Sequence, residues 1–491
     1  MSHQSDAVIA LPPTLRTQQR QAVDWMSARE RGSPPCGGIL ADNVGAGKTF
    51  VVAALTASAP LWPTLVLVPK SVLWQWIEVL HRFGLGSELC VVGSKTTYAM
   101  QRAATCKLVL ATHGLLLSPF LAERKWGRIV VDEAHCAKNP RSRTHRALCG
   151  LKAHARWALS ATPVQNCVAD LLALARFVGV LTDDAQMVRE LYVLRRCGGE
   201  ADDQQNKAAI PLTVRTVRLP LRYKAEEAAY ALAREEAKGE EEDDEFEGEE
   251  GEQEMGSAAA HTRAWEIQLR CRQAATHPAL YYGSLARRLQ MQGVGGGGEA
   301  GLSIEMAALA ARVRRDPSAK IAFVVEDIAA ARCGCVVFCD WIDEMRLVEE
   351  ALVADGRVSA QDVRGFHGQL NVQERDDALG WFRRGCGGQH RCSTVLIAQI
   401  RCAAQGLNLQ CAERAYIMRP QWNPAVERQA IGRLHRSGQT RPVTVLRLVA
   451  KGTVDEAMLR RQTRKLKCVT ETLRDDEMER TLTEGMGDMK I

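Results

Sequence analysis

The stretch best suited to chemistry is residues 42–49, which contains two glycines followed by a lysine and a threonine hydroxyl. A short apolar run typical of a buried strand precedes this stretch, and residues 50–55 read as an apolar helix. Glycine has no Cβ, so the N–H groups of such a turn can surround a phosphate, and the helix N-terminus favours an anion. The phosphate-loop pattern assigns phosphate contacts to Lys48 and Mg²⁺ coordination to Thr49. Asp42 replaces the first glycine of that pattern, and a chance Gly-Lys-Thr in a glycine-rich loop stays the alternative for this stretch alone.

A second candidate is the carboxylate pair Asp132-Glu133, which ends an apolar run that begins at Arg128. Such a run is typical of a buried strand, and open α/β sheets bind ligands at the carboxyl ends of their strands. We expect Asp132 to hold Mg²⁺ and Glu133 to orient or deprotonate the attacking water. A solvated strand end is the alternative, and the phosphate-loop pattern upstream argues against it.

Two further groups could contact a nucleotide. Arg433 and Arg436 are three residues apart, which in a helix would place both on one face, where they could stabilise a transferring phosphoryl group. A nucleic-acid backbone contact or a solvated helix face is the alternative. Gln19 lies in an amphipathic helix upstream of the phosphate loop, and its amide could read an adenine edge, although a surface position is the alternative.

Apolar strands alternate with helices in two parts of the chain, which predicts two α/β units with doubly wound parallel sheets. We expect strands in the first part at residues 65–69, 107–112, 128–132 and 156–163, and in the second at 335–339, 394–398, 415–418 and 443–449. Between them, the acidic residues 240–250 are expected to be disordered, residues 265–273 helical, and residues 293–298 a flexible linker. The expected domains are a first lobe at 12–200, a helical, partly disordered insert at 201–303, and a second lobe at 304–475 that closes with a basic helix.

Composition and charge limit the class of protein. A chain of 491 residues that is 46% hydrophobic and 25% charged is typical of globular proteins, and it contains neither a long apolar run nor a secretory signal, so we expect an intracellular protein without a membrane partner. The 16 cysteines form no Cys-x-x-Cys pair, so we expect reduced, mostly buried residues and no zinc site. The net charge of +6 combines −12 in residues 235–254 with +18 elsewhere, and this basic remainder suits a polyanionic partner, although an ordinary arginine-rich composition is the alternative.

Taken in order, a series of blocks resembles the Swi/Snf-type ATPases of helicase superfamily II. The blocks of the first half are residues 15–26, 38–49, 66–71 with Trp76, Asp132-Glu133-Ala134-His135 with Lys138-Asn139, 159–166, and Arg195-Arg196. Those of the second half are residues 269–273 with His277-Pro278, 366–368, 406–409, 422–424 with Glu427, and 429–439. The resemblance therefore covers nearly the whole chain.

The resemblance implies two RecA-like lobes that close on ATP and Mg²⁺, bind double-stranded DNA, and move along the duplex, usually without separating its strands. It implies that Gln19 contacts adenine, Glu133 is the catalytic carboxylate, and Arg433 and Arg436 are finger arginines. The resemblance also implies that Thr49 and Asp132 are the Mg²⁺ ligands. The full set of further residues that it implies at the nucleotide and its ion is Asp42, Asn43, Val44, Gly45, Ala46, Gly47, Lys48, Thr49, Asp132 and Gln429. Asp42 is normal for this family. The block at 269–278 is most similar to the branch linked to DNA repair and fork remodelling; the zinc RING that members of that branch often carry is absent, so ubiquitin transfer is not expected.

Some positions depart from the family pattern. The family usually has Asp at Gly432 and Arg419, an aromatic residue at Gln421, and two glycines at Ala403-Ala404. Two hypotheses follow: an active DNA translocase, working in the nucleus or at a site of viral DNA replication, or a nucleotide-binding scaffold with little turnover in a transcription or packaging assembly. A strand-separating helicase is a third hypothesis within the enzyme class. No reader domain is visible, so we expect protein partners to supply targeting.

Overall fold

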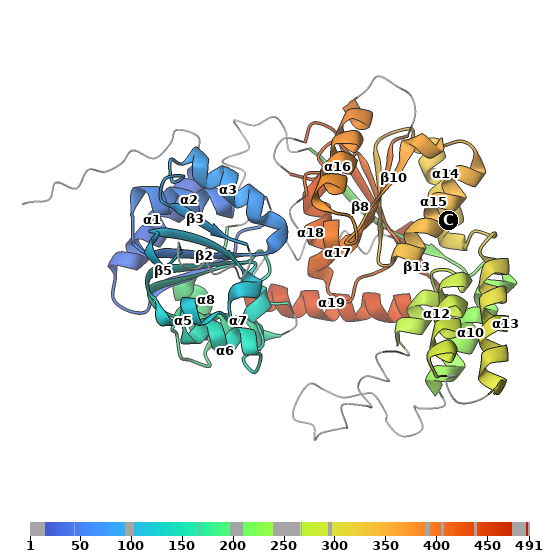
Figure 1. The fold of residues 1–491 in the computed structure, drawn as a ribbon, viewed down its shortest axis with the longest axis horizontal. Coiled ribbons are helices and arrows are strands. Elements are labelled where there is room, and N and C mark those ends of the chain that lie inside the picture. Colours follow the sequence, from blue (N-terminus) through green and yellow to red (C-terminus); the bar gives the residue numbers. More distant parts are fainter. Residues whose placement is uncertain are drawn as a thin grey trace, which may run out of the picture. The chain divides into compact units, whose positions relative to one another are not determined.

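The computed structural model describes residues 15–43, 45–93, 103–165, 167–196, 210–238, 266, 268–292, 297–387, 393–403, 407–436, 439–473 and 488–489 (Figure 1). The chain divides into unit 1, which comprises Met1–Ala209 and Arg464–Thr481, and unit 2, which comprises Ile210–Thr463 and Leu482–Ile491. Within the described residues each unit contains one seven-stranded sheet, and every strand pair is parallel. The predicted α/β class with two parallel sheets is confirmed.

The sheet of unit 1 has the strand order β3-β4-β2-β5-β6-β1-β7. In that order the strands are β3 (Leu89–Val92), β4 (Leu108–Thr112), β2 (Thr64–Val68), β5 (Lys125–Asp132), β6 (Lys152–Leu159), β1 (Cys36–Leu40) and β7 (Val193–Leu194). The four strands predicted for this half are all present, with ends that differ by a few residues.

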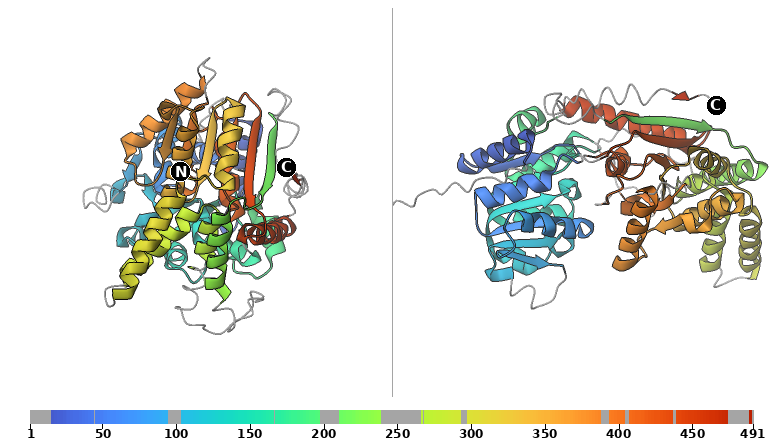
Figure 2. Two further views of the ribbon diagram at one scale, coloured as in Figure 1. Left: turned by 90° about the vertical axis from the view of Figure 1, so that its right-hand side faces the viewer. Right: turned by 90° about the horizontal axis from the view of Figure 1, so that it is seen from above.

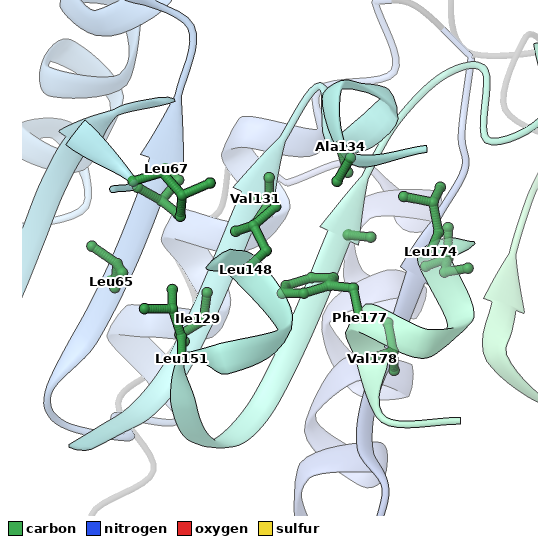
Figure 3. Close-up of a cluster of buried hydrophobic side chains, with 14 of the residues drawn as sticks. Leu65, Leu67, Ile129, Val131, Ala134, Leu148, Leu151, Leu174, Phe177 and Val178 are labelled. Atoms are coloured by element: carbon green, nitrogen blue, oxygen red, sulfur yellow. The ribbon is translucent and has the colours of Figure 1, made fainter. Parts of the chain in front are cut away.

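Side chains of the central strands alternate between two apolar layers. Leu65 and Leu67 contact a cluster that contains Leu148 of α6 (Arg143–Gly150) and Phe177 of α7 (Val168–Val178), as Figure 3 shows. The intervening Val66 faces the opposite layer, with α1 (Thr17–Arg31), α2 (Lys48–Ser58) and α3 (Leu73–Arg82). Burial on both faces explains why the strands read as continuous apolar runs. The remaining helices of this unit are α5 (Pro119–Glu123), α8 (Ala185–Tyr192), η1 (Lys70–Val72), η2 (His113–Leu115) and η3 (Ala134–Ala137).

The glycines at the start of β1 are required by close packing. A Cβ on Gly37 would lie 2.0 Å from the carbonyl oxygen of Arg156 on β6, and one on Gly38 would lie 2.7 Å from the ring of Trp25 on α1. These distances are shorter than any van der Waals contact, so a larger residue here would push β1 away from its neighbours.

The sheet of unit 2 has the strand order β10-β11-β9-β12-β13-β8-β14. In that order the strands are β10 (Val363–Phe366), β11 (Val395–Gln399), β9 (Cys335–Cys339), β12 (Arg414–Ile417), β13 (Val443–Ala450), β8 (Leu212–Leu219) and β14 (Asp488–Met489). The helices that accompany the sheet are α14 (Ala319–Ala331), α15 (Ile342–Asp355), α16 (Val372–Gly387), α17 (Ile400–Ala403), α18 (Pro424–Leu434) and η5 (Ala360–Asp362). The four strands predicted for this half are confirmed.

The strand β8 was not predicted from the sequence. It pairs with β13 along its whole length, from Leu212 beside Val443 to Leu219 beside Ala450. Its sequence interleaves arginines with apolar residues, so it lacks the continuous apolar character of the other strands. The second sheet therefore includes a strand from the part of the chain predicted as an insert.

A helical group belongs to unit 2. It consists of α10 (Lys224–Lys238), α12 (Pro278–Gln292) and α13 (Gly297–Val313), and Figure 2 shows α12 and α13 side by side. Ala233, Tyr281 and Tyr282 form its small core. Gly297 and Gly298 lie in α13, so the prediction of a flexible linker at residues 293–298 is wrong for these two, and residues 293–296 lie outside the described residues. The acidic residues 240–250, which are predicted to be disordered, also lie outside the described residues.

The closing basic helix is α19 (Val454–Leu473), as predicted. Its residues from Arg464 onward belong to unit 1, where Val469 and Leu473 are buried in the apolar cluster beside Leu65. Among the helices that the structure describes, none has the length and apolar character that crossing a membrane requires.

Candidate nucleotide site

Three adjacent strands of unit 1 end at the same level. Leu40 of β1 lies beside Leu159 of β6, which lies beside Asp132 of β5. Because the strands are parallel, the phosphate loop, the carboxylate pair and the loop at residues 160–162 leave the sheet at one edge. Asp132 is the last residue of its strand, as predicted.

The phosphate loop has the backbone expected of an anion site. Gly45 and Gly47 have positive φ angles of 87° and 83°, a region in which glycine is strongly favoured. Helix α2 starts at Lys48, and no side chain caps its N-terminus, so the end of the helix is suited to an anionic ligand. Val44 lies outside the described residues, so its predicted contact is not visible.

The ammonium group of Lys48 lies inside the curve of the loop. Its Nζ donates to the carbonyl oxygens of Asp42, at 2.7 Å, and Asn43, at 3.1 Å. Burial lowers the pKa of Lys48, and the nearby carboxylates of Glu133 and Asp132 oppose that shift. The structure thus brings Lys48 close to both acids of the predicted site.

The carboxylate of Asp132 is held at both oxygens. The indole Nε1 of Trp76 donates to Oδ2 at 2.8 Å, and the backbone N–H of Glu133 donates to Oδ1 at 3.0 Å. Burial raises the pKa of Asp132 to about 6, and the charge of Glu133 adds to the rise. A carboxylate together with the Thr49 hydroxyl on α2 supplies the hard oxygen ligands that Mg²⁺ prefers, so these residues fit the ion.

Glu133 has an uncommon backbone conformation. Its φ and ψ are both 49°, in the left-handed region that residues other than glycine rarely occupy. Such strained conformations are concentrated at functional sites. The Oε2 of Glu133 lies 3.2 Å from Nδ1 of His135.

Gln19 contacts the phosphate loop. Its Nε2 donates to the carbonyl of Ala46 at 3.0 Å, and its Oε1 accepts from the N–H of Arg16 at 3.0 Å. A Cβ on Gly47 would lie 2.3 Å from this Nε2, and the φ of 83° at this position also favours glycine. The side chain is buried, so the alternative of a surface position is wrong.

Hydrogen bonds between side chains join the loops that follow β5 and β6. Lys138 Nζ donates to Gln165 Oε1 at 2.9 Å, and Gln165 Nε2 donates to the Thr162 hydroxyl at 3.3 Å. These residues lie in the family blocks, but their contacts were not predicted, because spacing along one chain contains no information on a link between loops. Trp76, Arg195 and Arg196 also lie in family blocks, and their contacts were not predicted for the same reason.

The arginines of unit 2 are arranged differently from the prediction. Gln429 and Arg433 are buried on α18, but that helix ends at Leu434, and His435 has a non-helical φ of −89° and ψ of 89°. Arg436 therefore lies beyond the helix, and the prediction of one shared helical face is wrong. Two contacts account for the end of the helix: Gln439 Nε2 donates to the Leu434 carbonyl at 3.3 Å, and His435 Nε2 lies 2.8 Å from the carbonyl oxygen of Ile210.

Two of the departures from the family pattern have partners in the core of unit 2. Arg419 is 1% exposed, and its Nη2 donates to Glu344 Oε1 at 2.5 Å while its guanidinium lies 3.7 Å from the centre of the Trp341 ring. Gln421 Nε2 donates to Asp340 Oδ1 at 3.0 Å. Both side chains are thus integrated into a buried polar network, while Ala404 lies outside the described residues.

Comparison with known proteins finds two families along the chain. The SNF2-related domain matches residues 18–190, and the helicase conserved C-terminal domain matches residues 320–438. The chain belongs to the Swi/Snf-type family of superfamily II helicases. The two units of this Swi/Snf-type protein are its RecA-like lobes, and the family consists of ATP-hydrolysing, helicase-like enzymes that use ATP, typically with Mg²⁺.

Relatives of this Swi/Snf-type chain differ in length. The chain is 27% identical over 502 residues to the "Probable global transactivator" of Orgyia pseudotsugata multicapsid polyhedrosis virus. This alignment covers 94% of the chain and 92% of the viral protein. The chain is 25% identical over 674 residues to DNA repair protein RAD5B of Arabidopsis thaliana. This alignment covers 96% of the chain and 52% of the plant protein. A solved Sulfolobus solfataricus SWI2/SNF2 ATPase core in complex with dsDNA is similar over 97% of each chain, at 21% identity and a TM-score of 0.38. The chain therefore spans about half the length of the plant relative and nearly all of the viral one.

Proposed function

We propose that the protein is an ATP-dependent translocase on double-stranded DNA, which couples ATP hydrolysis to movement along DNA or to the remodelling of protein–DNA complexes. The observation that carries the proposal is the convergence of the phosphate loop, Asp132 and Glu133 at one edge of the unit 1 sheet. The two family matches support the same activity, since together they include residues of both lobes.

Each residue of this edge then has a chemical role. Lys48 binds the phosphates, Thr49 and Asp132 hold Mg²⁺, and Glu133 orients and deprotonates the attacking water. Arg433 and Arg436 of unit 2 stabilise the charge that develops on the transferring phosphoryl group. The remaining nucleotide contacts, including those of the loop backbone and the adenine contact, are Gln19, Asp42, Asn43, Val44, Gly45, Ala46, Gly47 and Gln429.

Double-stranded DNA is the polyanion that we propose as partner. The chain carries +18 outside residues 235–254, and a positive surface supplies the sequence-independent attraction to phosphates that a translocase needs. Relatives named as DNA repair proteins support the choice of DNA, and together with a viral transactivator they support activity in the nucleus or at a site of viral DNA replication. Protein partners would supply targeting.

The test is ATP turnover by the full chain without nucleic acid and with single-stranded DNA, duplex DNA or RNA. The proposal expects the strongest stimulation by duplex DNA, together with ATP-dependent displacement of a triplex-forming strand and no unwinding of a plain duplex. Equal turnover under all four conditions would refute it. Robust separation of a forked duplex would identify a strand-separating helicase instead.

A nucleotide-binding scaffold with little turnover is the second candidate, and the departures at Arg419 and Gln421 favour it. The contacts of Arg419 with Glu344 and of Gln421 with Asp340 weaken that argument, because the unusual side chains have buried partners of complementary charge and hydrogen-bonding capacity. Tight ATP binding without turnover under any of the four conditions would favour the scaffold.

A further inference from the structure

Arg195 and Arg196 leave the unit 1 sheet beside the phosphate loop. They directly follow β7, which pairs with β1 so that Leu194 lies beside Leu40. The N–H of Ala41 donates to the Leu194 carbonyl at 2.7 Å, which extends this pairing by one step. The two arginines therefore start at the same level as the loop that follows β1.

Arg196 pairs with the first residue of the loop. Asp42 is 2% exposed, and its Oδ1 accepts from the backbone N–H of Arg196 at 3.1 Å and from its Nε at 3.2 Å. The Nη2 of Arg196 donates to the other oxygen, Oδ2, so the contact is bidentate. Such a fork fixes both the position and the orientation of the carboxylate.

Arg195 makes contacts of a different kind, with two backbone carbonyl oxygens and one side-chain amide. Its Nη1 lies within hydrogen-bond distance of two carbonyl oxygens, that of Ala41 at 3.0 Å and that of Ala161 at 3.3 Å. Its Nη2 donates to the side-chain oxygen of Asn43 at 3.3 Å. One guanidinium thus joins the start of the phosphate loop to the loop that follows β6. Its charge is close enough to Lys48 to contribute to the lowering of that pKa.

The contacts of Arg195 and Arg196 compensate for the buried negative charge of Asp42. A carboxylate buried at the entrance of a loop suited to phosphates would repel a polyanionic ligand, and an unpaired buried charge is strongly unfavourable. Arg196 cancels that charge, and Arg195 holds the loop backbone on which the phosphate-facing N–H groups depend.

We propose that Arg195 and Arg196 are positioning residues of the nucleotide site: Arg196 acts through its charge on Asp42, and Arg195 acts through its fork geometry on the loop. The proposal rests on the nucleotide binding proposed above. It predicts that the two positions respond differently to lysine, because lysine keeps the charge but is a point donor that cannot bridge several acceptors.

The experiment measures the dissociation constant of ADP for the full chain by calorimetry. R196Q should raise that constant by about tenfold or more, since one partner of a buried pair is removed. The double variant D42N/R196Q removes both charges and should recover most of the lost affinity, and R196K should raise the constant less than R196Q. R195K should weaken binding about as much as R195Q, because the fork is lost in both.

The matched control is the surface pair Arg176–Asp183, whose atoms lie 3.7 Å apart with side chains 47% and 93% exposed. R176Q and D183N should leave ADP affinity unchanged. A normal dissociation constant for R196Q with a lowered melting temperature would show a purely structural role and overturn the proposal, as would a double variant no better than R196Q. If R196Q fails to fold, the dissociation constants of ADP for R196K and R195K are compared instead. Equal increases in these two constants would overturn the distinction between charge and geometry. Failure of the wild type to bind ADP would instead count against the proposed function itself.

Discussion

The indole N–H of Trp76 donates a hydrogen bond of 2.8 Å to Oδ2 of Asp132, and Trp76 is only 1% exposed. Trp76 lies on α3, so this helix contacts the carboxylate that ends β5. The N–H of Glu133 holds the other oxygen. The plane of the Asp132 carboxylate is therefore set from both sides by groups that the rest of the unit keeps in place.

Trp76→Phe removes this hydrogen bond and keeps a large aromatic side chain. We expect the Mg²⁺ concentration needed for half-maximal binding of a non-hydrolysable ATP analogue to rise about tenfold or more, since loss of a group that orients a metal ligand typically has an effect of that size. Trp74 lies on the same helix and is 72% exposed, so Trp74→Phe is the matched control. A Mg²⁺ dependence of Trp76→Phe that equals that of the control would show that the hydrogen bond does not orient the ligand.

Arg436 is proposed to act on the transferring phosphoryl group, where its charge would lower the energy of the transition state more than that of bound ATP. Arg436→Ala should bind ATP and DNA nearly normally and lose about 10³-fold or more in turnover. Arg441, a largely exposed residue paired with Glu413, provides the control Arg441→Ala. Turnover restored by saturating DNA would refute the role in phosphoryl transfer and indicate a DNA backbone contact.

The acidic residues 235–254 should be dispensable for ATP hydrolysis. The deletion must be limited to residues 239–254, because Glu236 of α10 forms an ion pair of 2.9 Å with Arg270. Deleting these like charges should leave turnover unchanged and raise DNA affinity, most clearly at low salt, where attraction to phosphates is least screened. The measurement is DNA binding by fluorescence anisotropy over a salt series, together with turnover. Loss of ATP hydrolysis would contradict the expectation.

Arg419 should stabilise unit 2 through its buried partners. Arg419→Asp, which introduces the residue usual in the family, places a third carboxylate beside Glu344 and Asp340 and should lower the free energy of unfolding by about 3–5 kcal/mol. Arg419→Met removes the charge but retains apolar volume and should cost less. Urea unfolding followed by circular dichroism measures both. An Arg419→Asp protein as stable as the wild type would show that the ion pairs contribute little.

Most of the fold was predictable because its strands are buried on both faces. Residues 65–68 and 335–339 read as strands without further information, since every side chain must be apolar there. The strand β8 was missed because its arginines break that pattern. The end of α18 before Arg436 was missed because it depends on the contact of His435 with the Ile210 carbonyl, a residue far away in the chain. Spacing predicted that Asp132 ends a strand, and it contained no information on Trp76, Arg195 or Arg196, whose contacts exist only in the folded unit.

The most direct test of the central claim is the rate of ATP hydrolysis by the wild type and Glu133→Gln over a series of duplex DNA concentrations. The account predicts that duplex DNA stimulates the wild type and that Glu133→Gln binds ATP but hydrolyses it about 10²-fold or more slowly, because the carboxylate that accepts the proton is gone. Wild-type turnover that is the same with and without duplex DNA, or a Glu133→Gln protein as active as the wild type, would contradict it.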